Sequence, residues 1–502
     1  MAADPGASGQ VARGTAVLSA AFVVVGGANY AFTIAMAHLL SPAGFGVLAV
    51  VQTFLLFAAW FTSAGLPWAA ARRLAREGST MEATAALRGA LVGNVVLASM
   101  LAAVLVLLLA LGRLQLDRQS ATPVLLAAVA CSLTGFNAAA KGGLQGLLRL
   151  RWLGTAALAE VGVKLGLGTA LAAIGLGATG AALGILAGML AGACVCLAGL
   201  AGLPRARGAG LGGFRLLREG LPLFVATAAT AALASIDIFA VKLLFPAATS
   251  NTAAGVYQAS ATLARIPYFL SSALTLAVFP LIVRAAGDRG LARSYVRKGV
   301  LWLVALVAPV SVVLLSNPSA ALALFYPAGY TRGVVALRLL AAGTPFLALS
   351  GLLVGVLQAM GRVRLPAAMA SAAVVLEVVG LGLGVPAAAA RSPQAGIAAA
   401  AAAFTASNVL LAVVLGVQVA RASGWHPRLR GTAAFAAACL AMAAVVALPD
   451  VRGIAFVAVV AVGGLVYAGL IRALGVITAA DLDTIRRTLP AAGFGRLGWR
   501  RR

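Results

Sequence analysis

Long runs of apolar residues recur along this chain of 502 residues, and they constrain its fold more than any other feature. A helix needs about 20 consecutive apolar residues to cross a bilayer, and many of the runs reach that length. Hydrophobic residues make up 62% of the chain and charged residues only 10%, whereas an ordinary soluble domain is about half apolar. The sequence therefore predicts an all-α polytopic membrane protein.

Charged residues, prolines and glycines divide the apolar sequence into about fourteen candidate membrane spans. These cover 14–40, 47–71, 89–111, 122–148, 152–175, 178–203, 220–245, 255–283, 297–316, 333–360, 366–390, 395–420, 432–448 and 454–475. The run at 432–448 is short and the breaks after 175 and 390 are weak. Twelve or thirteen spans are therefore also consistent with the sequence.

The distribution of Lys and Arg tests this assignment independently. With the N-terminus in the cytoplasm, 28 of the 38 basic residues fall in cytoplasmic segments, five in outer loops and five within spans. This is the positive-inside pattern of membrane proteins, and it predicts that both chain ends face the cytoplasm. It also accounts for the net charge of +26 without a nucleic-acid partner. The Ala-, Gly- and Val-rich composition is typical of a GC-rich bacterial genome, so we place the chain in the bacterial cytoplasmic membrane.

A motif at the end of one span recurs 213 residues later. Leu144-Gln145-x-x-x-Arg149-x-Arg151 returns as Leu357-Gln358-x-x-x-Arg362-x-Arg364, and each copy precedes a span that carries an acid, Glu160 or Glu377. The repeat aligns spans 1–6 with spans 7–12, and because six is even the two halves share one orientation. Chance similarity in an Ala-, Leu- and Gly-rich sequence is the alternative.

The repeat and the charge pattern together predict the organisation of the chain. We expect a cytoplasmic tail over 1–13, a first six-helix bundle over 14–203, a cytoplasmic linker over 204–219, a second six-helix bundle over 220–420, two further transmembrane helices over 432–475 and a basic cytoplasmic tail over 476–502. Two bundles with a central crevice are an architecture of transporters.

Several segments resemble a known family. These are Leu-Leu-Ser-Pro-Ala-Gly-Phe-Gly-Val at 39–47, Arg72-Arg73-Leu-Ala-Arg76, the run from Asp237 to Pro246, Ala-Ala-Gly-Val-Tyr-Gln-Ala-Ser-Ala at 253–261, and Phe279-Pro280. Together they are similar to the polysaccharide flippases of the multidrug/oligosaccharidyl-lipid/polysaccharide exporter superfamily, over about residues 10–475. The motifs separate this superfamily from other transporters better than they separate its substrates.

The resemblance implies a transporter that flips a polyprenyl-diphosphate-linked oligosaccharide across the cytoplasmic membrane by alternating access. Such cargo is a precursor of cell-surface polysaccharide, as in O-antigen export and lipopolysaccharide biosynthesis, and polysaccharide polymerases or glycosyltransferases are the expected partners. Two alternatives stay open: a cation-coupled exporter of the multidrug and toxin extrusion branch, and a lipid II-type flippase. Few aromatic residues in the spans disfavour the first, and the near absence of basic residues in the first two spans disfavours the second.

An enzyme is not expected. No outer loop exceeds about 16 residues, and the two histidines, His38 and His426, are far apart in sequence. The chain has no phosphate-binding loop for ATP. Four cysteines lie within apolar segments, where small buried residues are a better interpretation than a metal site.

Ionisable residues within spans are costly and usually face a pathway. A lipid diphosphate needs a cationic cavity, for which Arg is the better fork and Lys a point charge. We expect Arg265, Lys164 and Lys141 to line that cavity, with Arg338 near its outer mouth. Structural alternatives exist. Glu160 and Lys164 can pair on one helix, Arg265 can pair with Asp237 between helices, and Lys141, Lys242 and Arg338 can snorkel to the headgroups.

A second polar set is a candidate for ion coupling. Some members of the superfamily bind a cation between the corresponding spans, and here Asp237, Glu377, Thr405 and Asn408 fall on spans 7, 11 and 12. Carboxylates with neutral oxygens suit Na⁺ or H⁺. The alternative is a polar contact between helices. No other cofactor is expected.

Overall fold

The computed structural model describes residues 5–63, 65–114, 116, 118–204, 224–269, 271, 274, 282, 285, 288–425, 429–447 and 451–476. The expected linker after Pro204, most of the last part of the eighth span and the basic tail after residue 476 lie outside these residues. The described part of the chain is helical and contains no strand. The all-α fold class is confirmed.

The first half of the molecule is built from seven α-helices and one π-helical turn. They are α1 (Pro5–Leu39), α2 (Pro42–Ser63), α3 (Leu66–Glu77), α4 (Met81–Ala110), α5 (Arg118–Gly146), α6 (Leu150–Leu171), η1 (Ala172–Leu176) and α7 (Gly177–Gly199). Helices α1, α2, α4, α5, α6 and α7 are long and pack mainly against one another.

The second half follows with a bent pair of helices, 224–233 and α9 (Ile236–Leu244), which meet at 52°. After these come α10 (Ala247–Ala264), α12 (Arg289–Ser316), α13 (Pro318–Phe325), η2 (Ala328–Gly333), α14 (Val334–Ala359), α15 (Arg364–Ala389) and α16 (Pro393–Ser423). The hairpin of α17 (Leu429–Ala447) and α18 (Ile454–Ala473) packs on the outside of α12.

The span expected over 47–71 is divided in the structure. Helix α2 ends at Ser63, and the separate short helix α3 begins at Leu66. The break falls at Gly65, whose φ is 83°, and Pro67 follows in the first turn of α3. The charges of Arg72, Arg73 and Arg76 then keep the end of α3 out of hydrocarbon. Arg73 instead binds Glu77 at 3.1 Å and Glu82 at 2.9 Å.

The weak break expected after residue 175 is a true reversal of the chain. At η1 the backbone of Gly175 has φ 100°, a conformation that residues with a Cβ rarely adopt. Helices α6 and α7 then pack antiparallel along their whole lengths, with Gly168 opposite Gly184 and Glu160 opposite Gly192. Small residues allow such close packing of membrane helices.

Nine helices among the described residues are long and apolar enough to cross a membrane, or ten if the bent pair forms one span. That number treats residues 150–199 as one helix, although they form the α6–α7 hairpin. It also leaves out the shorter apolar helices within α1 and α17. The total of fourteen spans therefore stays a prediction.

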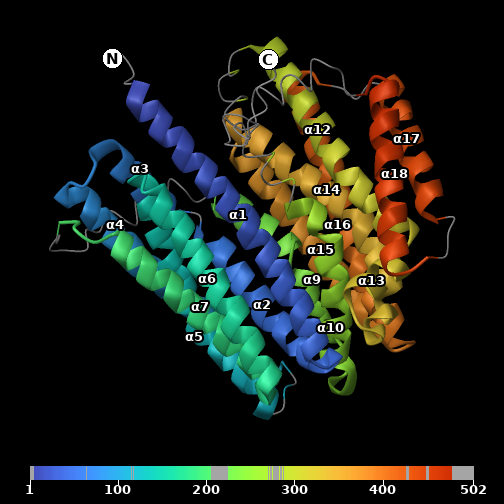
Figure 1. Ribbon diagram of the computed structural model, residues 1–502, viewed down its shortest axis with the longest axis horizontal. Helices are drawn as coiled ribbons and strands as arrows, with labels where there is room; N and C mark the ends of the chain where they lie inside the picture. Colours follow the sequence, from blue (N-terminus) through green and yellow to red (C-terminus); the bar gives the residue numbers. More distant parts are fainter. Residues whose placement is uncertain are drawn as a thin grey trace, which may run out of the picture.

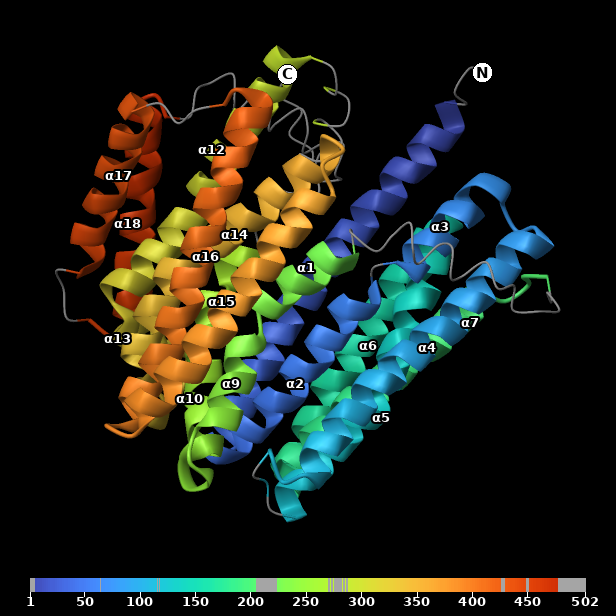
Figure 2. The ribbon, with the colours of Figure 1, turned by 180° about the vertical axis from the view of Figure 1, so that it is seen from behind.

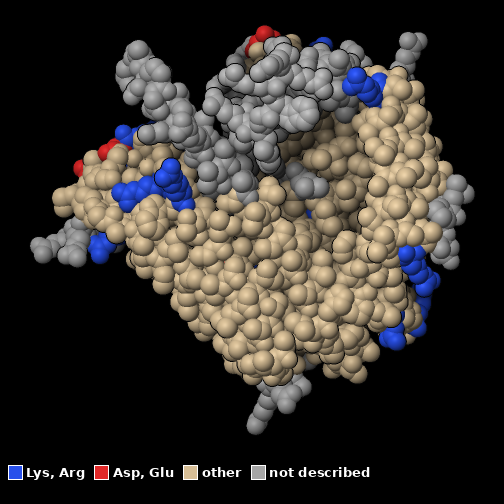
Figure 3. All heavy atoms as spheres, viewed as in Figure 1, with Lys and Arg blue, Asp and Glu red and all other residues tan. Residues whose placement is uncertain are grey.

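The first turns of α1 and the last turn of α18 lie at the same end of the molecule (Figure 1). The halves are close together at the opposite end, where α2 and α10 lie side by side, and they diverge toward the end that holds the start of α1 (Figures 1 and 2). The surface in Figure 3 is hollowed near this diverging end, next to α17 and α18. A broad band of the same surface carries neither basic nor acidic side chains, as expected for a face in contact with lipid.

Candidate functional site: buried charges between two helix bundles

The two halves meet where α2 crosses α10. A Cβ atom added to Gly46 would lie 2.8 Å from the carbonyl carbon of Asn251, and one added to Gly255 would lie 3.1 Å from the carbonyl carbon of Pro42. Only glycine fits at either position. The segments after Pro42 and Pro246 thus pack against one another and hold this end of the molecule closed.

A buried ion pair lies further along α10 in the second half. Asp237 on α9 is fully buried, and its Oδ2 accepts hydrogen bonds from the Arg265 guanidinium at 2.5 Å and from the Tyr257 hydroxyl at 2.7 Å. The Oδ1 atom accepts from the backbone N–H of Ile238 at 2.9 Å. Asp237 therefore has a partner on each oxygen, and the interhelical pair expected as an alternative is formed.

Arg265 ends helix α10 and is only 7% exposed. Its guanidinium carbon lies 5.4 Å from the centre of the Phe404 ring on α16, a cation–π distance. The Nε–H has no partner among the described residues. From the first half, the Tyr30 side chain on α1 lies within electrostatic range of Arg265, and its buried hydroxyl has no partner in the described part of the chain.

Glu377 on α15 lies beside this pair. It is fully buried and is within electrostatic range of both Asp237 and Arg265. Its Oε2 accepts a hydrogen bond from the Ser407 hydroxyl on α16 at 3.2 Å, while Oε1 has no partner among the described residues. The neighbouring Asn408 is also buried, and its Oδ1 likewise lacks a described partner.

Thr405 is held differently from the other members of the expected ion-coupling set. Its hydroxyl donates to the backbone carbonyl of Leu339 on α14 at 2.7 Å, and its side chain is partly buried. A hydroxyl oxygen that donates one hydrogen bond still has lone pairs to offer. The structure thus places Asp237 on α9, Glu377 on α15, and Thr405 and Asn408 on α16, within one group of packed helices.

In the first half, Lys141 and Lys164 bind partners other than those expected from the sequence. Lys141 on α5 forms an ion pair with Glu160 on α6 at 2.6 Å. Lys164 donates to the Oδ1 of Asn29 on α1 at 2.7 Å and lies 4.6 Å from the centre of the Phe32 ring. The Glu160–Lys164 pair within one helix is therefore not formed, because α5 and α1 each bring a closer partner.

Arg338 and Lys242 complete the set of basic residues within the expected spans. Arg338 lies near the start of α14, and its side chain is exposed. Lys242 is fully buried, and its Nζ binds the Ser250 hydroxyl at 2.9 Å and the Asn251 side chain. The expected snorkelling of Lys242 is wrong, because two polar side chains at the start of α10 hold the ammonium group inside the protein.

Sequence reasoning named the neutral residues Thr405 and Asn408 but missed four other neutral members of this site. Tyr257, Ser407, Asn29 and Tyr30 carry no charge, so within apolar spans they resemble ordinary packing residues. One signal was present for Tyr257, which belongs to the segment whose resemblance to the family was noted. Its hydroxyl completes the hydrogen bonds of Asp237.

The arrangement keeps cations and carboxylates inside a largely apolar protein. Arg265 and Lys164 are cations from opposite halves, and each rests on an aromatic ring. Asp237 binds the Arg265 guanidinium, and Glu377 lies within electrostatic range of the same group. Within the described residues no group of three His, Cys, Asp or Glu side chains could form a metal centre.

Comparison with known proteins shows which family the chain belongs to. A family model described as polysaccharide biosynthesis protein matches residues 11–286, more than half of the chain, and the MatE family model matches residues 222–381. The chain belongs to the polysaccharide biosynthesis protein family, within the flippases and transporters of the exporter superfamily named above. No curated protein matches the chain by sequence.

Solved structures share the fold at low sequence identity. A lipid II flippase MurJ in an inward closed conformation superposes with a TM-score of 0.74 at 14% identity, covering 94% of this chain and 99% of that one. A multidrug resistance MATE family transporter in an inward-facing conformation gives 0.59 at 15% identity, covering 78% and 94%. An outward-facing MATE transporter gives 0.58 at 15% identity, covering 83% and 95%.

Proposed function

We propose that the protein flips a polyprenyl-diphosphate-linked oligosaccharide, a precursor of cell-surface polysaccharide, across the bacterial cytoplasmic membrane. Membership of the polysaccharide biosynthesis protein family is the observation that carries this proposal. The cargo would reach the molecule from the end where the halves diverge, which we assign to the cytoplasm because, among the described residues outside the expected spans, most Lys and Arg belong to segments at that end. Glycosyltransferases and a polysaccharide polymerase would supply and consume the cargo.

The cations Arg265 and Lys164 suit the charged part of such a cargo. Arg265 lies at the end of the helix that contacts the first half, and Lys164 lies between α1 and α6 of that half. A diphosphate that moves between the bundles could bind both cations. Arg265 would donate two parallel hydrogen bonds to its oxygens, and Lys164 would attract it as a compact positive charge. Lys141, neutralised by Glu160, and the exposed Arg338 would contribute more weakly.

Na⁺ or H⁺ would drive the cycle through the second half. The unpartnered oxygens of Glu377 and Asn408, with the Thr405 hydroxyl, fit a small cation better than Asp237 does, because Asp237 already holds Arg265. Asp237 would join this set after Arg265 turns toward the cargo. These residues would orient the cation and keep it away from lipid.

The direct test is the leaflet position of the lipid-linked sugar in a strain that lacks the gene. The proposal expects the precursor to accumulate on the inner leaflet and to return to the outer leaflet when the gene is restored. Arg265→Ala should fail to restore it, whereas the outer-loop variant Arg113→Gln should succeed. Normal outer-leaflet precursor in the deletion strain would contradict the proposal.

The MatE match over residues 222–381 supports a second candidate, a cation-coupled exporter of small molecules. That function predicts that the deletion strain becomes sensitive to cationic dyes while its lipid-linked sugars stay normally distributed. Accumulation of lipid II alone would indicate the third alternative, a lipid II-type flippase.

A further inference from the structure

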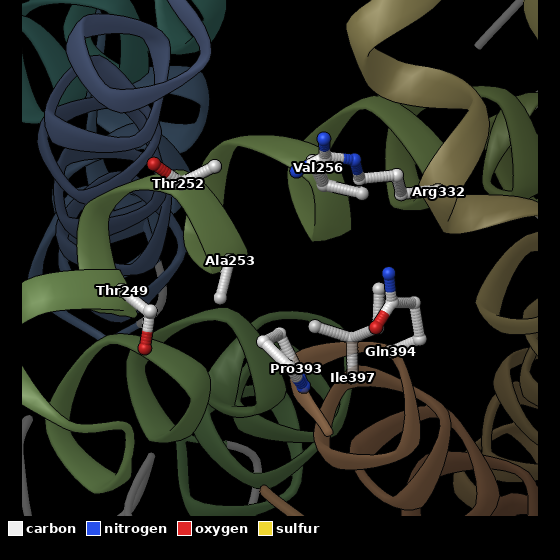
Figure 4. A pocket seen from close by; sticks show the side chains of 8 residues that line it. All are labelled: Thr249, Thr252, Ala253, Val256, Arg332, Pro393, Gln394 and Ile397. Carbon is white, nitrogen blue, oxygen red and sulfur yellow. The ribbon is translucent and has the colours of Figure 1, made fainter.

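A pocket on the second half lies apart from the buried ion pair. It is formed by α10, η2 and the first turn of α16, and its volume is about 280 Å³ (Figure 4). Figure 1 places these elements at the closed end of the molecule, opposite the start of α1. Arg265 follows Val256 by nine residues along the helix, which separates the two by about 13 Å along the helix axis at 1.5 Å per residue. The pocket is therefore separate from the central site.

The lining of the pocket combines an apolar floor with polar side chains, two of which have no partner among the described residues. Ala253, Val256 and Ile397 are buried and form the apolar part. Arg332 and Gln394 extend into the pocket from opposite elements, η2 and α16 (Figure 4). Among the described residues neither side chain has a hydrogen bond or ion pair, and no carboxylate lines the pocket.

A guanidinium without a described partner, in a pocket whose described lining has no acid, favours a negatively charged ligand. Arg offers a planar set of donors that matches the two oxygens of a phosphate or carboxylate, and the amide of Gln394 supplies a further donor. The volume is near the lower limit of about 300–1,000 Å³ for small-molecule pockets. The pocket can hold one headgroup or one sugar unit, but not a whole oligosaccharide.

We propose that this pocket binds a single oxyanion group, a phosphate or a carboxylate, at the closed end of the transporter. The ligand would bridge α10, η2 and α16 on the face of α10 opposite the one that contacts α2. Two sources present this chemistry: the headgroup of an anionic bilayer lipid, and a phosphorylated or acidic sugar. The site does not depend on the cargo proposed above.

The test uses the full-length protein in lipid nanodiscs with two probes. Glucose 1-phosphate is titrated against protein in phosphatidylcholine nanodiscs, and retention of phosphatidylglycerol is measured by native mass spectrometry after mixed-lipid reconstitution. Arg332→Gln should weaken at least one of the two by about tenfold or more, the loss expected for a charged hydrogen-bond partner. Arg332→Lys should retain part of the affinity, because the charge stays while the fork is lost.

Arg113→Gln is the matched control, since Arg113 is exposed in an outer turn of the first half. Arg332 is also exposed and has no partner among the described residues, so its removal should leave the folded protein intact, and the unfolding temperature checks this. Loss of the sugar phosphate alone assigns the site to soluble ligands, and loss of the lipid alone assigns it to a headgroup. Equal binding of both probes by Arg332→Gln and Arg113→Gln would overturn the proposal.

Discussion

The ion pair of the second half is almost sealed, whereas that of the first half is open. The Arg265 and Asp237 side chains are 8% and 0% exposed, while those of Lys141 and Glu160 are 28% and 27% exposed. Both pairs join two helices at hydrogen-bond distance. The two pairs differ in how completely the packed helices cover their side chains.

Burial determines how much stability the protein loses when one partner of an ion pair is removed. A charge left alone in a sealed site has nowhere to find water, whereas a partly exposed charge can be hydrated again. The pair of Asp237 and Arg265 should therefore separate only when other charges replace both partners, and the first half should tolerate exchange of partners more easily. A transporter that must release its cargo benefits from having both kinds of site.

The largest expected effect is that of Arg265→Ala. This change leaves Asp237 buried without its cation and should lower the free energy of unfolding by about 3–5 kcal/mol. Thermal unfolding in detergent and a denaturant titration would measure the loss. The double variant Asp237→Leu/Arg265→Met should recover much of that stability, because the buried charge is removed along with its partner. A single variant as stable as the wild type would show that the pair is not sealed.

Glu377→Gln should act in the opposite direction within the same half. The Glu377 carboxylate has no cation at bonding distance in the described structure and one oxygen without a partner. A neutral isostere should therefore leave stability unchanged or raise it by about 1 kcal/mol. Transport by this variant should no longer depend on the Na⁺ or proton gradient. A marked loss of stability would mean that the charge of Glu377 is structural.

Much of the fold could be predicted from the sequence, because the constraints on it are local. Hydropathy located the apolar helices, and the segments 39–47 and 253–261, which carry the resemblance to the family, prove to be in contact. The division of the second span at α3 was missed. Its three arginines were visible, but the apolar residues before them obscured the end of the helix.

The site could be predicted only in part. Charge within a span identified every ionised member, and the depth of Asp237 and Arg265 suggested their pairing. Partner choice depends on how each helix is rotated about its axis, which the sequence does not specify locally. Lys164 thus binds Asn29, 135 positions away, and Glu160 binds Lys141 rather than its neighbour on the same helix.

A double-mutant cycle on the first-half pair gives the third prediction. The coupling energy between Lys141→Ala and Glu160→Gln should be about 1 kcal/mol or less, since both side chains are partly exposed. It should fall as salt is raised, while the coupling between Asp237 and Arg265 should barely change. Unfolding titrations at low and high ionic strength would measure both cycles. A salt-independent coupling of several kcal/mol for Lys141 and Glu160 would remove the distinction between the halves.

The smallest expected effect concerns the ring beneath Lys164. Phe32→Leu keeps an apolar side chain at this fully buried position but removes the aromatic face that lies 4.6 Å from the ammonium nitrogen. The cation–π part of the loss should be about 0.5–1 kcal/mol, because Lys164 also keeps its hydrogen bond to Asn29. Packing changes add to any core substitution, so the same change is made in a Lys164→Met background, and the difference between the two costs isolates the interaction. A difference near zero would mean that Asn29 alone holds Lys164. The ammonium group would then be still freer to leave for a passing diphosphate, and the contrast with the sealed Arg265 would be sharper.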